Sequence, residues 1–282
     1  MSQNRVWFVT GTSSGIGKEI AKAVLKGGDK VIAAARNLDS IKDLKELGAH
    51  TLQLDVTLSE KQLSSLMNDA INVYGQIDIL VNNAAFAIWG SIEETSEEET
   101  EKLFSTNFFG PLKLIKAVLP HMRSRRTGVI VNISSLAGVS GFKASSLYPA
   151  TKFALEGLSE SLKDEVQHLG IKVLVVEPGF FRTELASPNN MVIVKRTVSD
   201  YDQHYNEFDL TSIHHKQSGD PKKLAERLFD VVTQSGSAQG REIPFRLPIG
   251  DDAYPFVSSK YEKNLEELAN IKDLTSGTSF QE

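Results

Sequence analysis

Residues 10–17 read Thr-Gly-Thr-Ser-Ser-Gly-Ile-Gly. The apolar run Val6 to Val9 comes directly before this stretch, and the helical pattern Lys18 to Leu25 comes directly after it. This order predicts a strand, a glycine-rich turn and a helix. Because the same order opens the parallel sheets that bind dinucleotides, it favours an α/β fold with a nucleotide at the turn.

The three glycines have separate tasks in such a turn. Gly11 permits the tight turn, Gly15 lets a pyrophosphate approach the backbone, and Gly17 lets the helix pack closely on the strand. The phosphates are expected at the helix N-terminus, where free N–H groups and the helix dipole favour an anion. Within this turn the predicted cofactor contacts are Gly11, Ser13, Ser14, Gly15, Ile16 and Gly17.

A second signal lies far downstream, where Tyr148 and Lys152 are four residues apart and Ser135 stands thirteen residues before the tyrosine. Residues four apart on a helix share one face, so the ammonium is expected beside the phenol. A free tyrosine, with a pKa of about 10, is a poor acid and a poor base at neutral pH. We expect Lys152 to bring the pKa of Tyr148 toward the working pH, with Ser135 holding a carbonyl oxygen beside the phenol.

These signals, in this order, resemble the short-chain dehydrogenase/reductase family, and the resemblance covers most of the chain. The stretch 243–253 and the amphipathic helix after it are similar to a subgroup related to 17β-hydroxysteroid and retinol dehydrogenases. The further motifs that carry the resemblance are Asp55-Val56, Asn82-Asn83-Ala84-Ala85, Asn107, Ser134-Ser135 and Pro178-Gly179.

The resemblance implies a role for each residue of a reductive centre. It implies that Ser135 polarises the substrate carbonyl, that Tyr148 donates the proton, and that Lys152 holds the nicotinamide ribose while lowering the tyrosine pKa. Asn107 would hold a water in the proton relay. The predicted catalytic residues are therefore Asn107, Ser135, Tyr148 and Lys152. Beyond the glycine turn, the predicted cofactor contacts are Arg36, Asp55, Val56, Asn83, Ala84, Tyr148, Lys152, Pro178, Gly179, Phe181 and Thr183.

Strand-like runs alternate with helical patterns along the chain, with no linker between them. Several runs are apolar throughout, as expected for strands covered on both faces. The alternation predicts α/β architecture: a single doubly wound Rossmann-type domain with a parallel sheet of about seven strands. We expect a dinucleotide-binding catalytic domain at 1–240 and a C-terminal helical extension at 241–282 packed on the same domain. The expected strands are 5–10, 30–35, 50–54, 77–81, 128–133, 171–177 and 242–247.

Composition narrows the class of protein. The 282 residues include no cysteine, which excludes disulfides, thiolate metal sites and a cysteine nucleophile. The net charge of −5, with acids and bases interspersed, argues against nucleic acid as a partner. A strand begins within a few residues of Met1 and no apolar run is long enough for a membrane span, so a cytoplasmic protein is expected. No metal site is expected, because His214, His215, Asp200 and Asp202 lack further ligands at metal spacing.

The choice of cofactor depends on the residues at the end of the second expected strand. An enzyme that uses NAD normally places an acid there to hold the ribose hydroxyls, and Ala35 fills that place. The neighbouring Arg36 offers a planar, permanently charged donor fork that suits a 2'-phosphate. Ser14 counts against NADP, because it occupies the position where many NADP-dependent relatives carry a second basic residue. Ala35 and Arg36 together still favour NADP(H) over NAD(H).

A long loop at about 180–218, after Pro178-Gly179, is expected to cover the substrate. A loop of this length in a compact domain is usually either functional or disordered. Its apolar residues, with others from the body of the domain, indicate a pocket for a bulky apolar carbonyl compound, although they could equally be lid packing. The candidates are Phe86, Ile88, Trp89, Leu136, Val139, Phe142, Phe180, Phe181, Leu185, Met191, Val192, Ile193, Val194, Tyr201, Tyr205 and Phe208.

Two further segments have interpretations based on helix physics. The acidic run Glu93 to Glu101 is interpreted as a helix start, because Ser96 and Glu99 form a capping box and acids favour a helix N-terminus. Near the C-terminus, apolar residues recur every three and four positions and give one stripe, which we expect to pack on the body of the chain. The stripe comprises Tyr261, Leu265, Leu268, Ile271 and Leu274.

Three functions are compatible with this reading. The leading hypothesis is an NADPH-dependent carbonyl reductase acting on a small-molecule ketone or aldehyde, or on the alcohol in reverse. The second is an NAD-dependent secondary-alcohol dehydrogenase or a 3-oxoacyl reductase on the same scaffold. The third is a nucleotide-sensing scaffold without catalysis, which the intact set of candidate catalytic residues disfavours. The resemblance is compatible with a homo-oligomer, a dimer or a tetramer, because relatives commonly pair through the helices bearing Asn107 and Tyr148. The C-terminal extension could instead cover or rebuild that surface.

Overall fold

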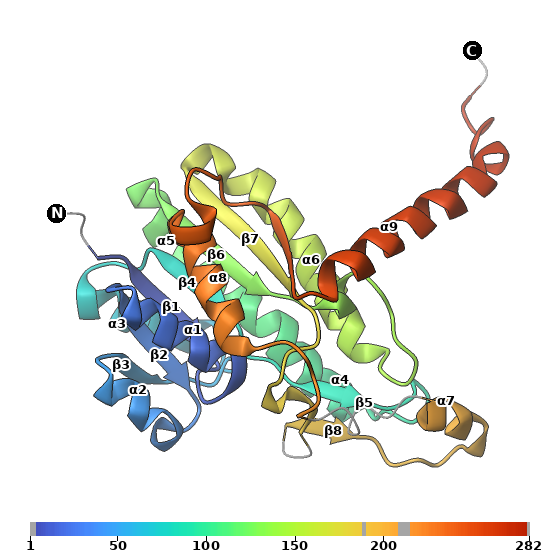
Figure 1. Cartoon of the computed structure of the whole chain (residues 1–282), viewed down its shortest axis with the longest axis horizontal. Coiled ribbons are helices and arrows are strands. Elements are labelled where there is room, and N and C mark those ends of the chain that lie inside the picture. Colours follow the sequence, from blue (N-terminus) through green and yellow to red (C-terminus); the bar gives the residue numbers. More distant parts are fainter. Residues whose placement is uncertain (1–3, 188–189, 208–214, 281–282) are drawn as a thin grey trace.

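A seven-stranded parallel sheet forms the centre of the protein (Figure 1). The computed structural model describes residues 4–187, 190–207 and 215–280. The strand order is β3-β2-β1-β4-β6-β7-β9, which confirms the predicted doubly wound arrangement. The strands are β1 (Val6–Thr10), β2 (Lys30–Ala35), β3 (His50–Gln53), β4 (Ile79–Asn82), β6 (Gly128–Ile133), β7 (Ile171–Pro178) and β9 (Arg246–Ile249).

Helices cover both faces of the sheet. One face carries α1 (Gly15–Lys26), α2 (Lys42–Glu46) and α8 (Pro221–Thr233). The other face carries α3 (Glu60–Tyr74), α5 (Gly110–Arg125) and α6 (Leu147–Val166). Alternate residues of β1 therefore enter different cores, with Trp7 packed toward α1 and Phe8 toward α3. Both side chains are almost fully buried, which explains why this strand is apolar throughout.

The last strand lies later in the chain than the pattern indicated. Pairing with β7 starts at Phe245, whose carbonyl accepts from the N–H of Val175, rather than at residue 242. Pro244 has no N–H, which explains the later start. Pro248 is tolerated inside β9 because that strand forms the edge of the sheet.

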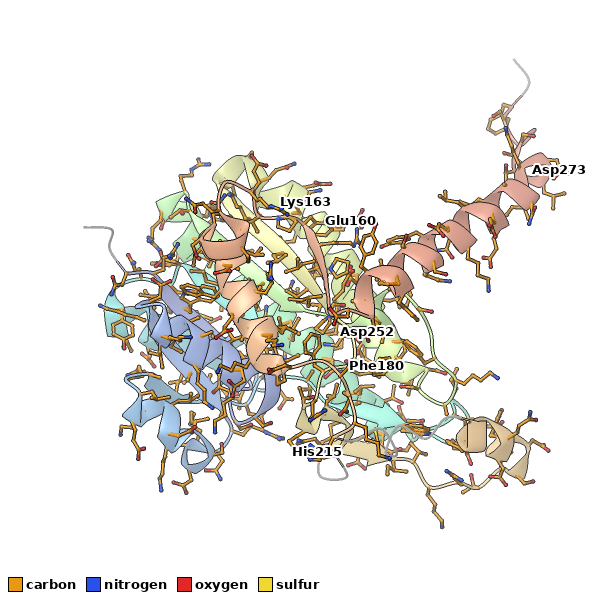
Figure 2. All side chains as sticks on the ribbon, in the orientation of Figure 1. Glu160, Lys163, Phe180, His215, Asp252 and Asp273 are labelled. Carbon is orange, nitrogen blue, oxygen red and sulfur yellow. The ribbon has the colours of Figure 1, made fainter. Side chains whose placement is uncertain are left out.

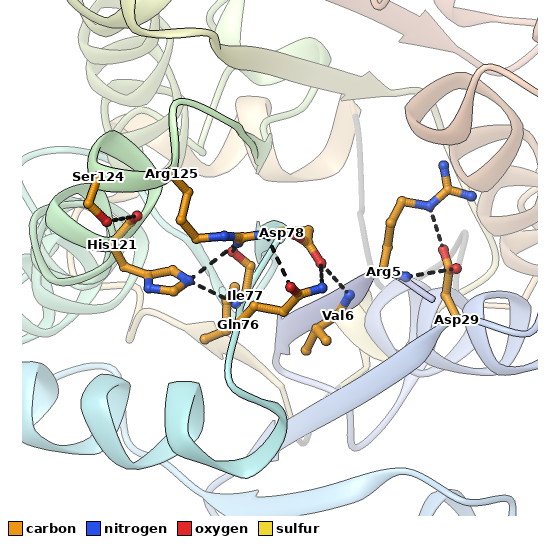
Figure 3. A network of polar contacts seen from close by, with 9 residues as sticks. All are labelled: Arg5, Val6, Asp29, Gln76, Ile77, Asp78, His121, Ser124 and Arg125. Carbon is orange, nitrogen blue, oxygen red and sulfur yellow. Dashed lines mark hydrogen bonds and ion pairs between the residues drawn. The ribbon is translucent and has the colours of Figure 1, made fainter. Parts of the chain in front are cut away.

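Ion pairs connect the amino ends of the strands, far from the glycine turn (Figure 3). The carboxylate of Asp78 accepts from the backbone N–H of Val6 at 2.8 Å and from Arg125 Nη2 at 2.7 Å. Asp29 accepts from Arg5 Nε at 3.0 Å. These contacts join β1 to the start of β2 and the end of α5. They lie at the amino ends of the strands, whereas the glycine turn follows the carboxyl end of β1.

The remaining elements lie beyond the three layers. They are β5 (Ala87–Trp89), α4 (Glu97–Phe104), β8 (Met191–Ile193), α7 (Asp202–Glu207) and α9 (Ala253–Asn270). The predicted capping box is confirmed at the start of α4, where Ser96 Oγ accepts from the N–H of Glu99. Within the described ranges, no helix has both the length and the apolar character needed to cross a membrane.

Candidate active site

A cavity of about 650 Å³ opens at the carboxyl ends of the strands. Its lining contains every predicted cofactor contact except Gly17, together with Ser135 from the catalytic set. The structure therefore gathers residues from both halves of the chain into one site. This clustering follows from the fold, because the carboxyl ends of parallel strands all meet at the same edge.

The glycine turn leaves room for a ligand against bare backbone. Gly11 and Gly15 have φ values of +68° and +56°, a region in which side chains are strained. A Cβ on Gly17 would stand 2.3 Å from Asn83 Nδ2, so this glycine makes space for the asparagine. Asn83 Nδ2 in turn donates to the carbonyl oxygen of Thr10 at 2.9 Å. Gly17 thus shapes the turn from behind the cavity wall.

The hydroxyl of Thr10 was missed among the candidate site residues. It accepts from the N–H of Asn83 at 2.9 Å and from the N–H of Ala84 at 3.0 Å. These bonds join the end of β1 to the loop after β4, and both segments line the cavity. A threonine at the last position of a buried strand, directly before the glycine turn, is a signal that could have identified it.

The end of β2 presents a small residue and a cation to the cavity. Ala35 is almost fully buried, whereas Arg36 is exposed, and both residues line the cavity. No ion pair found within the described ranges involves the Arg36 guanidinium. Its charge therefore stays available for an anion at this wall. Asp55, on the same wall, accepts from the N–H of Thr57 at 2.9 Å.

Tyr148 and Lys152 lie together in the first turns of α6, and both are buried. Lys152 Nζ lies 5.7 Å from the centre of the tyrosine ring and donates to the carbonyl oxygen of Ile133 at 2.8 Å. Burial raises the pKa of Tyr148 to about 12, although a hydrogen bond with Ser135 lowers it in part. The expectation that Lys152 brings this pKa down toward neutrality is therefore wrong for this structure. Helical spacing predicts the neighbour correctly but carries no information about the depth of burial.

Asn107 lies behind the cavity wall in a π-helical segment, Ser105–Phe109, between α4 and α5. Its Nδ2 donates to the carbonyl oxygen of Phe86 at 2.9 Å and to Thr151 Oγ1 at 3.2 Å. Its Oδ1 accepts from the N–H of Phe86. The side chain therefore fixes the loop after β4 against the start of α6. π-Helical turns are rare and often occur at functional sites.

Two buried carboxyl groups stand behind Lys152. Glu156 and Glu177 are 4% and 0% exposed, and Arg246 Nε lies 3.3 Å from Glu156 Oε2 and 3.4 Å from Glu177 Oε1. Burial raises the pKa of Glu177 to about 7, with the charge of Glu156 adding to the effect. Burial also lowers the pKa of Lys152 to about 8, against the attraction of Glu156. A glutamate within the apolar run of β7 was the sequence signal for this cluster, and it was missed.

We expect this cluster to make stability depend on pH. A carboxyl with a raised folded-state pKa contributes stability below its unfolded pKa, and that contribution is lost as pH rises through the folded value. For Glu177 this window runs from 4.5 to about 7. The free energy of unfolding of Glu177→Gln, relative to that of the wild type, should therefore rise by up to about 3 kcal/mol between pH 4.5 and pH 8. Urea denaturation at several pH values measures it, with the exposed Glu165→Gln of α6 as control. A pH-independent difference for Glu177→Gln would contradict the assignment.

The segment after β7 is held over the cavity from its far side. β8 pairs in parallel with β5, so that Met191 lies opposite Ala87. The carboxylate of Glu94 accepts from the backbone N–H groups of Thr197 and Val198 and from the Tyr205 hydroxyl. These hydrogen bonds, led by that of Thr197, lower the pKa of Glu94 to about 2. An acid interpreted only as part of a helix start therefore also anchors the covering segment.

The apolar candidates for substrate contact divide into two groups. Those that line the cavity are Phe86, Leu136, Phe142, Phe180, Phe181, Leu185, Met191 and Val192. The others pack elsewhere or are exposed, namely Ile88, Trp89, Val139, Ile193, Val194, Tyr201 and Tyr205, while Phe208 lies outside the described residues. Two lysines that were not predicted, Lys102 and Lys143, also line the cavity.

The C-terminal extension reaches this site through one aspartate. Asp252, directly before α9, accepts from the backbone N–H of Phe180 at 2.8 Å. A Cβ on Gly179 would stand 2.1 Å from Asp252 Oδ1, so the glycine admits the carboxylate. The extension therefore supports the loop that follows β7 and lines the cavity.

Among the described residues of the substrate loop, the possible metal ligands form no cluster. Among the residues that the structure describes, no group of three or more histidine, aspartate or glutamate side chains could hold a metal ion. His215 Nε2 lies 3.7 Å from Glu184 Oε1, and His214 lies outside the described residues.

Known proteins share this sequence pattern and fold. A family model described as short chain dehydrogenase matches residues 5–192. The chain is 34% identical to the 3-ketodihydrosphingosine reductase of Bacteroides thetaiotaomicron over 264 residues, which cover 93% of this chain and 92% of that protein.

Two solved structures extend the comparison to three dimensions. A short-chain dehydrogenase from Streptomyces avermitilis is 38% identical, with a TM-score of 0.89 over 99% of this chain and 100% of that one. ElxO with NADP bound is 29% identical, with a TM-score of 0.69 over 87% of this chain and 96% of that one. The likeness to the Streptomyces protein includes the C-terminal extension, because almost the whole chain is covered.

Proposed function

The chain belongs to the short-chain dehydrogenase family and is an NAD(P)-dependent oxidoreductase, and we propose that it is an NADPH-dependent carbonyl reductase. The observation that carries the proposal is the convergence of Ser135, Tyr148 and Lys152 on one cavity whose lining also includes the glycine turn. A proton donor and a dinucleotide cradle are the two parts that carbonyl reduction needs.

The residues of the cavity fit a dinucleotide. The turn at Gly11 and Gly15 offers bare backbone, and α1 begins there with its free N–H groups. Arg36 would bind a 2'-phosphate, and the similar structure of ElxO with NADP bound supports that choice. When bound, the reduced nicotinamide supplies a hydride to the carbonyl carbon. Lys152 would hold the ribose beside it.

Tyr148 supplies the proton in this proposal. A pKa of about 12 keeps the phenol protonated at neutral pH, which is the form that can donate to a ketone oxygen. Ser135, which already hydrogen-bonds the phenol, would hold the same oxygen. Lys152, with a pKa of about 8, is mostly an ammonium at pH 7 and stabilises the phenolate left after transfer. Hydride reaches carbon and proton reaches oxygen, so the alcohol forms with charge balanced.

The substrate is proposed to be a ketone with a bulky apolar substituent. The lining of the cavity includes Phe86, Phe142, Leu136 and Met191, among other apolar side chains. Apolar walls with few polar groups suit an apolar ligand. The relative named as a 3-ketodihydrosphingosine reductase supports a ketone on a long hydrocarbon chain.

One experiment tests the proposed activity. NADPH and NADH binding is followed by protein fluorescence, and cofactor oxidation is then measured with ketones and aldehydes graded in size. We expect saturable NADPH binding and a kcat/KM that rises with the apolar bulk of the carbonyl. Tight binding without turnover of any carbonyl would favour a nucleotide-sensing scaffold. Preference for NADH would favour the secondary-alcohol dehydrogenase.

The cofactor choice leads to a specific prediction at Ala35. A carboxylate at this position would repel a 2'-phosphate and accept hydrogen bonds from ribose hydroxyls. Ala35→Asp is therefore expected to lower the NADPH/NADH ratio of kcat/KM by about 100-fold. Ala35→Asn is the matched control, since it adds similar bulk without charge and should shift the ratio far less. An unchanged ratio in the Asp variant would contradict the assignment of Arg36 and Ala35.

A further inference from the structure

Four ionisable side chains stand one helical turn apart along α6, namely Tyr148, Lys152, Glu156 and Glu160. Residues four apart share one face of a helix, so these side chains form a single row. The row starts at the cavity, which Tyr148 and Lys152 line, and ends at Glu160, labelled in Figure 2, whose side chain is 59% exposed. The first three members are buried, with exposed fractions of 9%, 3% and 4%. Glu156 is therefore the acid directly behind the buried lysine.

The segments that pack on the start of α6 are largely uncharged. The ammonium of Lys152 donates to the carbonyl oxygen of Ile133 at 2.8 Å. β5, β6 with the two serines after it, the turn Leu136–Gly138 and the π-helical segment contain no ionisable residue. From α4 the cavity wall receives Lys102, which is a second cation. Burial lowers the pKa of Lys152 to about 8, and Glu156 is the acid whose charge opposes this effect.

The carboxylate of Glu156 has a fixed place outside the cavity. Arg246 Nε, from β9, donates to its Oε2 at 3.3 Å, and Arg246 Nη2 donates to Glu160 Oε2 at 3.1 Å. A Cβ on Gly138 would stand 2.9 Å from Glu156 Oε1 and would touch Ser134 Oγ, so the bare glycine admits the carboxylate beside the end of β6. Glu156 is not among the residues that line the cavity. Any effect of Glu156 on the reaction therefore passes through a neighbour.

Two further ionisable groups lie near Arg246. Glu177 Oε1 of β7 lies 3.4 Å from Arg246 Nε. Burial raises the pKa of Tyr261 of α9, and the charge of Arg246 opposes that rise. Glu177, with a pKa of about 7, is protonated at mildly acidic pH. Burial also raises the pKa of Glu156, but a hydrogen bond with a serine and the charges of Arg246 and Lys152 oppose the rise. Glu156 is therefore the buried acid that faces two cations.

Most of the last helix lies beyond this cluster. Ala253 and Val257 are the only buried residues of α9. Figures 1 and 2 show the rest of the helix projecting away from the body of the protein. Leu265 and Leu268 are 66% and 59% exposed. The prediction that the apolar stripe packs on the body is therefore wrong for the residues after Tyr261.

We propose that Glu156 is a positioning residue for Lys152, because its carboxylate holds the lysine as an ammonium beside Tyr148, and that Arg246 from the last strand holds this carboxylate in turn. This role rests on the proposed function, in which the ammonium stabilises the phenolate left by proton transfer. It makes Glu156 responsible for the alkaline limit of carbonyl reduction. Above that limit Lys152 is neutral, and the phenolate loses the cation beside it.

Glu156→Gln tests this role through the pH dependence of reduction. Without the carboxylate, burial acts on Lys152 unopposed, so the pKa of the lysine should fall below about 8. We expect the alkaline limb of the rate of NADPH oxidation, measured by single-turnover stopped flow with a ketone, to move down by about one pH unit. The rate should stay within about twofold of the wild-type rate at pH 6 and lie about fivefold below it at pH 8.

Two matched variants separate charge from packing. Glu156→Asp keeps a carboxylate at this position, so it should restore most of the shift in the alkaline limb. Glu165→Gln, which changes an exposed residue of the same helix, should leave the limb where it is in the wild type. Equal shifts in the Asp and Gln variants would mean that Glu156 acts through packing, and so would a rate that falls equally at pH 6 and pH 8. Either result would overturn the proposal.

A titration without turnover measures the charge of Lys152 directly. Nuclear magnetic resonance of protein containing carbon-13 lysine follows each lysine, and the Lys152 signal is the one missing in Lys152→Met. Its midpoint should lie near pH 8 in the wild type and about one pH unit lower in Glu156→Gln. Glu156→Met, apolar and of similar length, should give the same shift if the Gln variant does not fold.

The two experiments fail in different ways. A Lys152 midpoint that is the same in the wild type and in the variant without the Glu156 charge would overturn the role of Glu156. A wild type that reduces no ketone would contradict the proposed function, and the titration would still decide whether Glu156 keeps Lys152 charged.

Discussion

Tyr148→Phe is expected to reduce kcat for carbonyl reduction by about 1,000-fold while NADPH still binds. The substitution removes only the phenolic oxygen, which is the proposed proton donor. The ring stays in its buried place beside Lys152, so the cavity keeps its shape. Stopped-flow mixing with NADPH and a ketone measures the reduction, and fluorescence titration measures cofactor affinity.

A matched control separates chemistry from packing. Tyr205 is also buried, and its hydroxyl contacts Glu94 and the backbone N–H of Ser91 rather than the cavity. Tyr205→Phe should therefore leave NADPH affinity unchanged and lower kcat by less than about tenfold, through a looser covering segment. If Tyr148→Phe retained a substantial part of the wild-type kcat, the proton donor would have to be another group.

Arg246→Met is expected to lower the free energy of unfolding at pH 8 by about 3 kcal/mol. The guanidinium is the cation between Glu156 and Glu177, which are 4% and 0% exposed. Without it, two carboxylates would face each other away from water. The loss should be smaller at pH 5, because the raised pKa of about 7 lets Glu177 take up a proton there.

Two further variants make this prediction specific to the cluster. Arg241→Met, an exposed arginine a few residues before β9, should change stability by less than about 0.5 kcal/mol. Adding Glu177→Gln to Arg246→Met should restore part of the loss at pH 8, because one of the two charges is gone. Urea denaturation followed by circular dichroism measures each variant. Equal losses at pH 5 and pH 8 would mean that Arg246 acts through packing alone.

Much of the fold and part of the site follow from short-range sequence patterns. The apolar runs predict the strands because a sheet covered on both faces needs them. The glycine turn at 10–17 and the spacing of Tyr148 and Lys152 depend only on neighbouring residues, so the sequence predicts them. Residues of both motifs line the cavity. Parallel topology then explains why residues 10–17 and Ser135 meet, although they are far apart in sequence.

Other features depend on contacts between distant segments, for which local periodicity carries no signal. The carboxylate of Glu94 accepts a hydrogen bond from the backbone N–H of Thr197, 103 residues away in sequence. Asp252 accepts one from the N–H of Phe180, 72 residues away. The predicted direction of the Tyr148 pKa shift was wrong for a related reason, since the whole fold determines how deeply the side chain is buried. The stripe on α9 was recognised as amphipathic, but the pattern alone does not say which surface covers it.

The placement of β9 has a consequence for the protein while it is being made. A ribosome produces residues 1–245 before this strand exists, so until then the long strand β7 has one unpaired edge. An open edge is a template for joining another chain. Messages truncated anywhere before Arg246 should therefore yield polypeptides that aggregate or are degraded, even though they encode every residue of the reductive centre. We therefore expect the final 37 residues to be needed for the folding of a site to which they contribute no predicted catalytic group.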